Sequence, residues 1–162
     1  MIRKKNKFSW PRKLYDKTRI QDENNLVEQY GLKNKREIWK AEAKVKYFRN
    51  RAKLLITADL KEQQQFFAKL SALGLSIRSI AEVLALNKED ILKRRLSTVV
   101  WNLKLAQTAR HARQLITHKK IIVDNCVIDV PSYIVPVALE QSISLKQSMG
   151  ASKKPGTAEA TA

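Results

Sequence analysis

The chain has 162 residues, of which 44% are hydrophobic, and its 32 lysines and arginines against 15 aspartates and glutamates give a formal net charge of +17. This composition predicts a packed core in one medium domain or two small ones, and it excludes a chain disordered throughout. The sequence predicts no membrane span and no secretory signal, and its single cysteine excludes an internal disulfide and a cysteine-rich zinc site. The excess of positive charge favours a polyanionic partner, usually a nucleic acid.

Residues 1–19 form a basic arm around two aromatic residues, Phe8 and Trp10. Pro11 and the density of charge disfavour a helix. The aromatic rings could stack on nucleic-acid bases or dock on the protein's own surface, and the sequence does not separate these alternatives. We expect the arm to order against a phosphate backbone. Its candidate contacts are Arg3, Lys4, Lys5, Lys7, Arg12 and Lys13.

Residues 20–86 predict a helical domain. Gly31 is expected to end its first helix, and Asn34 with Glu37 three positions later forms a capping-box pattern for the second. Apolar residues recur at helical spacing along the second helix and predict a buried stripe: Ile38, Val45, Phe48, Ala52 and Leu55. The remaining faces are basic with few acids, so we expect them to meet phosphates. The candidate contacts are Lys35, Arg36, Lys44, Arg49, Arg51 and Lys53.

Residues 57–86 predict the remaining helices of this domain. Asp59 is expected to cap one helix, Gly74 to end it, and Ser76 to cap the next. The Phe66–Phe67 pair could form a base-stacking platform, but core packing is the favoured interpretation.

Residues 87–145 form a basic module that ends in a predicted strand region, and no acidic residue occurs between Asp90 and Asp124. Asn87 is expected to cap a helix that continues to Val100, with Asp90 completing a capping box. The helical periodicity places Ile91, Leu92, Leu96, Val99 and Val100 inward and Lys93, Arg94 and Ser97 outward. Arg95 is expected at the boundary, with its stem packed and its charged head in water.

The next helix is expected to begin after Thr108, with Ala109, Ala112, Leu115 and Ile116 buried. Arg110 and Arg113 fall on the opposite face, where we expect them to contact a phosphate backbone without contributing to the fold. His111 and His118 are interpreted as phosphate contacts or helix-terminal charges rather than as a metal or catalytic pair. The candidate contacts of the module are Lys93, Arg94, Arg95, Arg110, His111, Arg113, Gln114, His118, Lys119 and Lys120.

Short β-strands are predicted after this helix. The segments 121–123 and 127–128 flank Asp124-Asn125, which predicts a tight hairpin turn. Residues 132–135 lie between two prolines and predict an edge strand. Cys126 is expected to pack as a small hydrophobe. Residues 146–162 are small and polar and predict a flexible tail.

Three segments of the module closely resemble the RNA-binding module named after small-subunit ribosomal protein four: LKRRL at 92–96, HARQLI at 111–116 and VPSY at 130–133. Two upstream segments are similar to the archaeal and eukaryotic branch of that ribosomal protein family: PRKLY at 11–15 and YGLKNKREIW at 30–39. The resemblance implies an α+β fold, with an N-terminal helical domain and a small module of two helices and a β-hairpin, the alpha-L type. Lys104 departs from the pattern, since glycine is common there, and a left-handed lysine would cost about 1 kcal/mol.

The resemblance implies a non-enzymatic structural protein of the small ribosomal subunit, located in the cytoplasm. Family members bind the small-subunit rRNA, help nucleate assembly of the subunit body, contact ribosomal protein five and lie beside the path by which mRNA enters, where they affect decoding accuracy. The expected partners are therefore rRNA, neighbouring ribosomal proteins and mRNA, with no membrane, cofactor or metal. The alternative is a non-ribosomal regulator that uses the same module on tRNA or stalled ribosomes, which the upstream similarity opposes.

Overall fold

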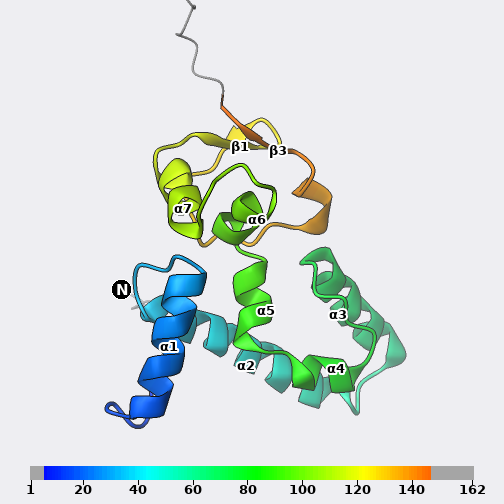
Figure 1. The fold of residues 1–162 in the computed structure, drawn as a ribbon. Helices are drawn as coiled ribbons and strands as arrows, with labels where there is room; N and C mark the ends of the chain where they lie inside the picture. Colours follow the sequence, from blue (N-terminus) through cyan, green and yellow to red (C-terminus); the bar gives the residue numbers. More distant parts are fainter. Residues whose placement is uncertain (1–5, 147–162) are drawn as a thin grey trace, which may run out of the picture.

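The structure is a computed structural model that describes residues 6–146. The predicted contacts Arg3, Lys4 and Lys5, and residues 147–162 of the predicted tail, lie outside this range. Helices alternate with turns in the first two thirds of the chain, and a small sheet follows (Figure 1), which confirms the predicted α+β class. The elements are α1 (Lys17–Gln29), α2 (Arg36–Leu55), α3 (Leu60–Ala72), α4 (Ile80–Ala85), α5 (Lys88–Lys93), α6 (Leu96–Asn102), α7 (Ala109–Thr117), β1 (Ile121–Val123), β2 (Cys126–Val127), the 3₁₀ turn η1 (Val137–Leu139) and β3 (Ile143–Leu145).

The helical part is organised on α2, which is 20 residues long. Its apolar stripe is buried as predicted, with Ile38 and Ala52 almost inaccessible to solvent. Figure 1 shows α1 near one end of α2, α3 and α4 toward the other, and α5 rising from its middle. Leu70, Val83 and Leu92 bring α3, α4 and α5 into the same hydrophobic cluster. The Phe66–Phe67 pair packs against this cluster, as the favoured interpretation expected.

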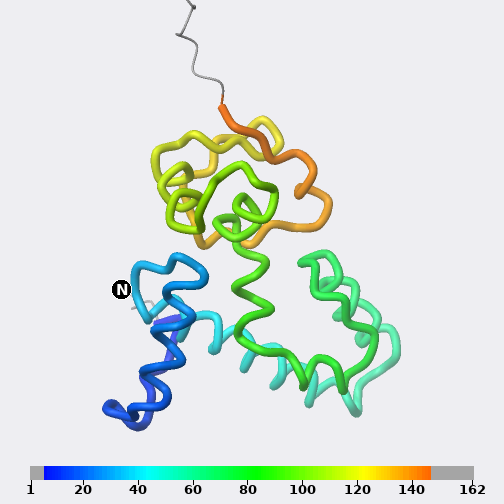
Figure 2. Tube along the Cα trace, viewed as in Figure 1, coloured from blue at the N-terminus to red at the C-terminus, as the bar shows by residue number. Residues whose placement is uncertain are grey.

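A second hydrophobic cluster forms between α6, α7 and the sheet, and it includes Leu96, Ile116 and Ile121. The strand order is β2-β1-β3, with both pairings antiparallel. The predicted hairpin is confirmed: Asp124 and Asn125 have φ of 49° and 60°, which is the positive-φ pair that a tight type I′ turn needs. The chain trace shows this part of the protein stacked over α2, with α5 leading into it (Figure 2).

Gly31 makes possible a close approach between the two parts. It follows α1 with φ of +59°, as expected of a helix-ending glycine. A Cβ at this position would lie 2.8 Å from the backbone carbonyl carbon of Ala109 and from the backbone nitrogen of Arg110, in the first turn of α7. Any side chain here would therefore push α7 away from α1.

The predicted helix from Asn87 to Val100 is wrong, because the chain breaks between α5 and α6. Arg95 is extended, with φ of −73° and ψ of 144°, and it forms an isolated bridge with Ile134. The Leu96 amide donates to the Tyr133 carbonyl at 2.7 Å. This pairing with a distant segment outweighs local helix propensity, and it changes which side chains face inward. Ser97 is buried rather than exposed.

The predicted edge strand at 132–135 is also wrong, since this segment makes only the isolated bridge to Arg95. The third strand of the sheet is β3, which pairs with β1. Cys126 is exposed on β2 rather than packed. Ser79 rather than Ser76 caps α4, with its hydroxyl accepting from the Glu82 amide at 3.4 Å.

Two local predictions are confirmed, and the conformation of Lys104 is established. Thr108 caps α7, its hydroxyl accepting from the His111 amide at 3.1 Å. Asp90 closes the predicted box by accepting from the Asn87 amide at 2.9 Å. Lys104 is left-handed, with φ of 58°.

Candidate RNA-binding surface

Arg94 is a structural residue rather than an exposed one, which corrects its predicted orientation. Its Nε donates to the Leu73 carbonyl at 3.0 Å and its Nη2 to the Val135 carbonyl at 2.9 Å. Its Nη1 pairs with Glu140 at 3.1 Å. A Cβ on Gly74 would overlap the guanidinium group, so this glycine leaves the space that Arg94 fills. Arg94 thus ties the end of α3 to the segment after the hairpin.

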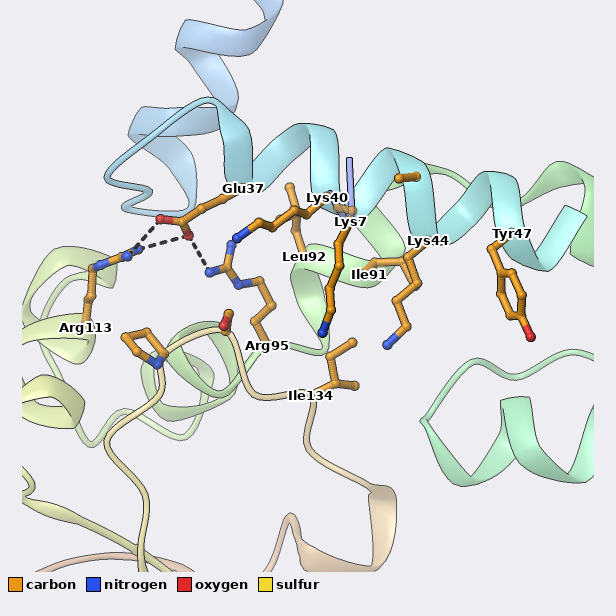
Figure 3. A pocket seen from close by; sticks show the side chains of 14 residues that line it. Lys7, Glu37, Lys40, Lys44, Tyr47, Ile91, Leu92, Arg95, Arg113 and Ile134 are labelled. Atoms are coloured by element: carbon orange, nitrogen blue, oxygen red, sulfur yellow. Dashed lines mark hydrogen bonds and ion pairs between the residues drawn. The ribbon is translucent and has the colours of Figure 1, made fainter. Parts of the chain in front are cut away.

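Arg95 and Arg113 share the carboxylate of Glu37 (Figure 3). The Arg95 Nη2 donates to the Glu37 Oε2, while Arg113 donates to both carboxylate oxygens, at 3.1 and 2.8 Å. Arg95 is buried, so the expectation of a wet guanidinium is wrong. The expectation that Arg113 does not contribute to the fold is also wrong, since it links α7 to α2.

Glu37 is held ionised by these partners. Burial alone would raise its pKa, but the hydrogen bonds and charges of Arg113 and Arg95 outweigh that effect and lower the pKa below its ordinary value. The predicted capping box is wrong, because the carboxylate binds the two arginines, and Asn34 instead accepts from the Arg36 amide at 2.9 Å.

The N-terminal arm docks on the protein's own surface, which decides between the two alternatives for its aromatic residues. The ring centroids of Phe8 and Trp10 lie 6.0 and 5.2 Å from that of Trp39 on α2. The Arg36 guanidinium lies 5.6 Å from the centre of the Trp10 ring. Trp39 is itself anchored, donating to the Glu23 carboxylate at 2.9 Å. The part of the arm around Phe8 and Trp10 therefore lies against α2.

Two further predicted contacts have intramolecular partners. The Arg49 Nη2 donates to the Leu86 carbonyl at 2.5 Å, so it supports the end of α4. The Lys35 ammonium lies 3.8 Å from the Glu23 carboxylate, with part of its side chain exposed.

The outer face of α7 remains open and basic. Arg110 and Gln114 project from the helix, and His118, Lys119 and Lys120 follow at its end, all of them exposed. His111, Gln114, Leu115, His118 and Lys120 line a shallow recess of about 200 Å³. These residues can offer hydrogen-bond donors and positive charge to phosphate oxygens.

A larger groove of about 780 Å³ runs between α2, the end of α5 and the segment 131–134. Lys40, Lys44 and Tyr47 contribute to it from one stripe of α2, and Lys7 reaches it from the arm (Figure 3). Burial lowers the pKa of Lys44 below its ordinary value. Lys40 and Tyr47 were not among the predicted contacts. Their spacing indicated that they share one face of a helix with Lys44, but nothing in the sequence indicated that the segment 131–134 lies opposite that face.

The remaining predicted contacts are exposed on other faces and do not gather into one site: Arg12, Lys13, Arg51, Lys53 and Lys93. Within residues 6–146, no group of three or more His, Cys, Asp or Glu side chains could hold a metal ion. Among the helices of the same range, none is long and apolar enough to cross a membrane.

The comparisons with known proteins cover both parts of the chain. The S4 domain family matches residues 94–140. The small ribosomal subunit protein uS4 of Picrophilus torridus is 40% identical over 151 residues, covering 88% of this chain and 82% of the relative. The chain belongs to the uS4 family. The uS4 proteins of Methanococcus aeolicus and Methanothermobacter thermautotrophicus are 43% and 38% identical, covering 78% and 88% of this chain and 75% and 86% of the relatives. The similarity to these uS4 proteins therefore extends over the helical part of the chain as well as over the S4 domain.

Proposed function

We propose that this protein is a structural component of the small ribosomal subunit that binds small-subunit rRNA in the cytoplasm, without enzymatic activity. The observation that supports this most strongly is the uS4 similarity along most of the chain, including the helices before the S4 domain. A regulator that had borrowed only the S4 domain would not need to share those helices. The net charge of +17 supplies the attraction to a polyanion that the proposal needs.

The basic residues divide into contacts and scaffold in this proposal. Arg49, Arg94, Arg95 and Arg113 hold elements of the protein together. The open face of α7 and the docked arm would meet the rRNA, with recognition resting on its shape, phosphates and 2′-hydroxyl groups. The proposed contacts are Arg3, Lys4, Lys5, Lys7, Arg12, Lys13, Lys35, Arg36, Lys44, Arg51, Lys53, Lys93, Arg110, His111, Gln114, His118, Lys119 and Lys120.

The finer parts of the proposal come from the family resemblance. They are nucleation of the subunit body, contact with ribosomal protein five, and a place beside incoming mRNA that affects decoding accuracy. The rigid connection between α2 and α7 through Glu37 is compatible with nucleation, because a pre-ordered protein surface can select one RNA junction geometry.

Sedimentation of the tagged chain tests the proposal. The chain should co-sediment with free small subunits and whole ribosomes in a sucrose gradient, in stoichiometric amount and after a wash at moderate salt. Recovery only with tRNA, or only with stalled ribosomes and in substoichiometric amount, would favour the regulator instead.

A further inference from the structure

The groove beside α2 is lined by more positively charged side chains than its acidic side chain can neutralise. Five cationic side chains line it, Lys7, Lys40, Lys44, Arg95 and Arg113, and Glu37 is the one acidic residue among the lining residues. Glu37 is already bound to the two arginines. Within the described range, the three lysines take part in no ion pair.

The placement of these lysines favours an anion between the two walls. Figure 3 shows the side chains of Lys7 and Lys44 extending from the α2 side toward the segment that carries Ile134. Lys44 is half-buried and its ammonium lies 5.9 Å from the centre of the Phe48 ring, so it has lost part of its hydration and has gained a ring face but no negative charge. A phosphate group would supply the missing interaction.

The rest of the groove offers apolar and aromatic surface rather than further charge. Its inner wall includes Ile91, Leu92 and Ile134. Tyr47 stands at one end with 65% of its surface exposed, although it lies on a helix with a well-packed opposite face. An exposed aromatic ring beside free ammonium groups is the combination that binds unpaired nucleotides, since bases stack on the ring while lysines hold the backbone.

We propose that this groove binds an unpaired nucleotide of RNA, with the base on Tyr47 and the phosphate between Lys44 and Lys7. The inference rests on the proposed rRNA binding and adds that the protein takes single-stranded as well as folded RNA. An acidic peptide would satisfy the lysines but would leave the ring and the apolar wall unused. A continuous RNA duplex keeps its bases stacked and paired, so it would offer phosphates to the lysines but no free base face to Tyr47.

The docked arm is part of this site. Phe8 and Trp10 pack on Trp39 and so bring Lys7, one residue earlier, against the α2 stripe. The docking of Phe8 and Trp10 therefore supplies one of the groove's cationic side chains, Lys7.

Binding of a fluorescent decauridylate and of a short RNA duplex with the same number of phosphates tests the proposal. Tyr47→Ala should weaken decauridylate binding by about tenfold and leave duplex binding unchanged, whereas Tyr47→Phe should retain both affinities. Lys44→Ala should reduce the salt dependence of decauridylate binding, lowering the slope of log K against log salt by about 0.7. Lys46→Ala removes the same charge from the far face of α2 and should affect both RNAs equally.

Direct contact is tested by replacing one uridine with 4-thiouridine and mapping the photo-crosslinked peptide. A crosslink in the tryptic peptide that contains Tyr47 supports the proposal. Equal losses for both RNAs in Tyr47→Ala, or crosslinks confined to α7, would overturn it. So would decaglutamate binding that depends on Lys44 while Tyr47→Ala has no effect on either RNA. A negative result in these tests would overturn the groove proposal alone, because the preference of the protein for rRNA is measured in a separate experiment.

Discussion

Replacing Glu37 with glutamine distinguishes the effect of net charge on RNA binding from the effect of the Glu37 ion pairs on the folded structure. The substitution keeps the size of the side chain but removes the carboxylate that Arg95 and Arg113 share. Generic electrostatics predicts that a basic protein with one acid fewer binds RNA more tightly. The structure predicts the opposite, because the two arginines then repel each other and the connection between α2 and α7 is lost.

The size of the effect follows from burial. The side chains of Arg95, Glu37 and Arg113 are 5%, 15% and 22% exposed. Breaking a buried ion pair by removing one partner costs about 3–5 kcal/mol, and the partial exposure of Arg113 brings the expected loss to roughly 2–4 kcal/mol. The midpoint of thermal unfolding should fall by about 2–4 °C for each kcal/mol.

Urea unfolding of Glu37→Gln, with Glu42→Gln as the control, measures this loss. Glu42 is an exposed acid on the same helix, so its variant should stay within about 0.5 kcal/mol of the parent protein. The rRNA affinity of Glu37→Gln should fall, while that of Glu42→Gln should stay equal or rise. A Glu37→Gln protein of unchanged stability and tighter rRNA binding would refute the proposed connection.

The pKa of Glu37 is lowered in the folded state, so its ion pairs stabilise the protein fully above the ordinary glutamate pKa of 4.5, and this stabilisation is lost as the pH falls through the lowered pKa. The free energy of unfolding of the parent protein should therefore fall in this acid range, whereas that of Glu37→Gln should lack this part of the pH dependence. Gly31→Ala should destabilise the protein by more than the roughly 1–2 kcal/mol of a left-handed alanine, since its Cβ also meets Ala109, and a cost below 1 kcal/mol in urea unfolding would count against that contact. Arg110→Ala should weaken rRNA binding without changing the unfolding midpoint, whereas Arg113→Ala should lower the midpoint as well; identical midpoints for the two variants would show that Arg113 is only a surface residue.

Local signals in the sequence predicted much of the fold. The glycine after α1, the Thr108 cap, the Asp124-Asn125 turn and the apolar stripe of α2 depend on residues close together in the chain, and each is confirmed. These features follow from backbone preferences and helical periodicity, which a short window of sequence contains.

The errors arose where a distant segment decides the local structure. Arg95 lies in a helical pattern, but its pairing with Ile134 extends the chain there. Glu37 fits a capping box, but two arginines from the S4 domain take its carboxylate. For the same reason, the positive charges were visible in the sequence, while their division between scaffold and open surface was not. The groove beside Tyr47 could not be predicted, because its two walls, α2 and the segment 131–134, are far apart in the sequence.

The most direct measurement is binding of the purified protein to a small-subunit rRNA fragment, with an unrelated structured RNA as competitor, across a series of salt concentrations. The uS4 family assignment predicts a preference for the rRNA of a few kcal/mol that persists at physiological salt, because shape recognition depends less on counterion release than phosphate attraction does. Equal affinity for both RNAs, lost together as salt rises, would contradict specific rRNA recognition and leave a nonspecific basic protein.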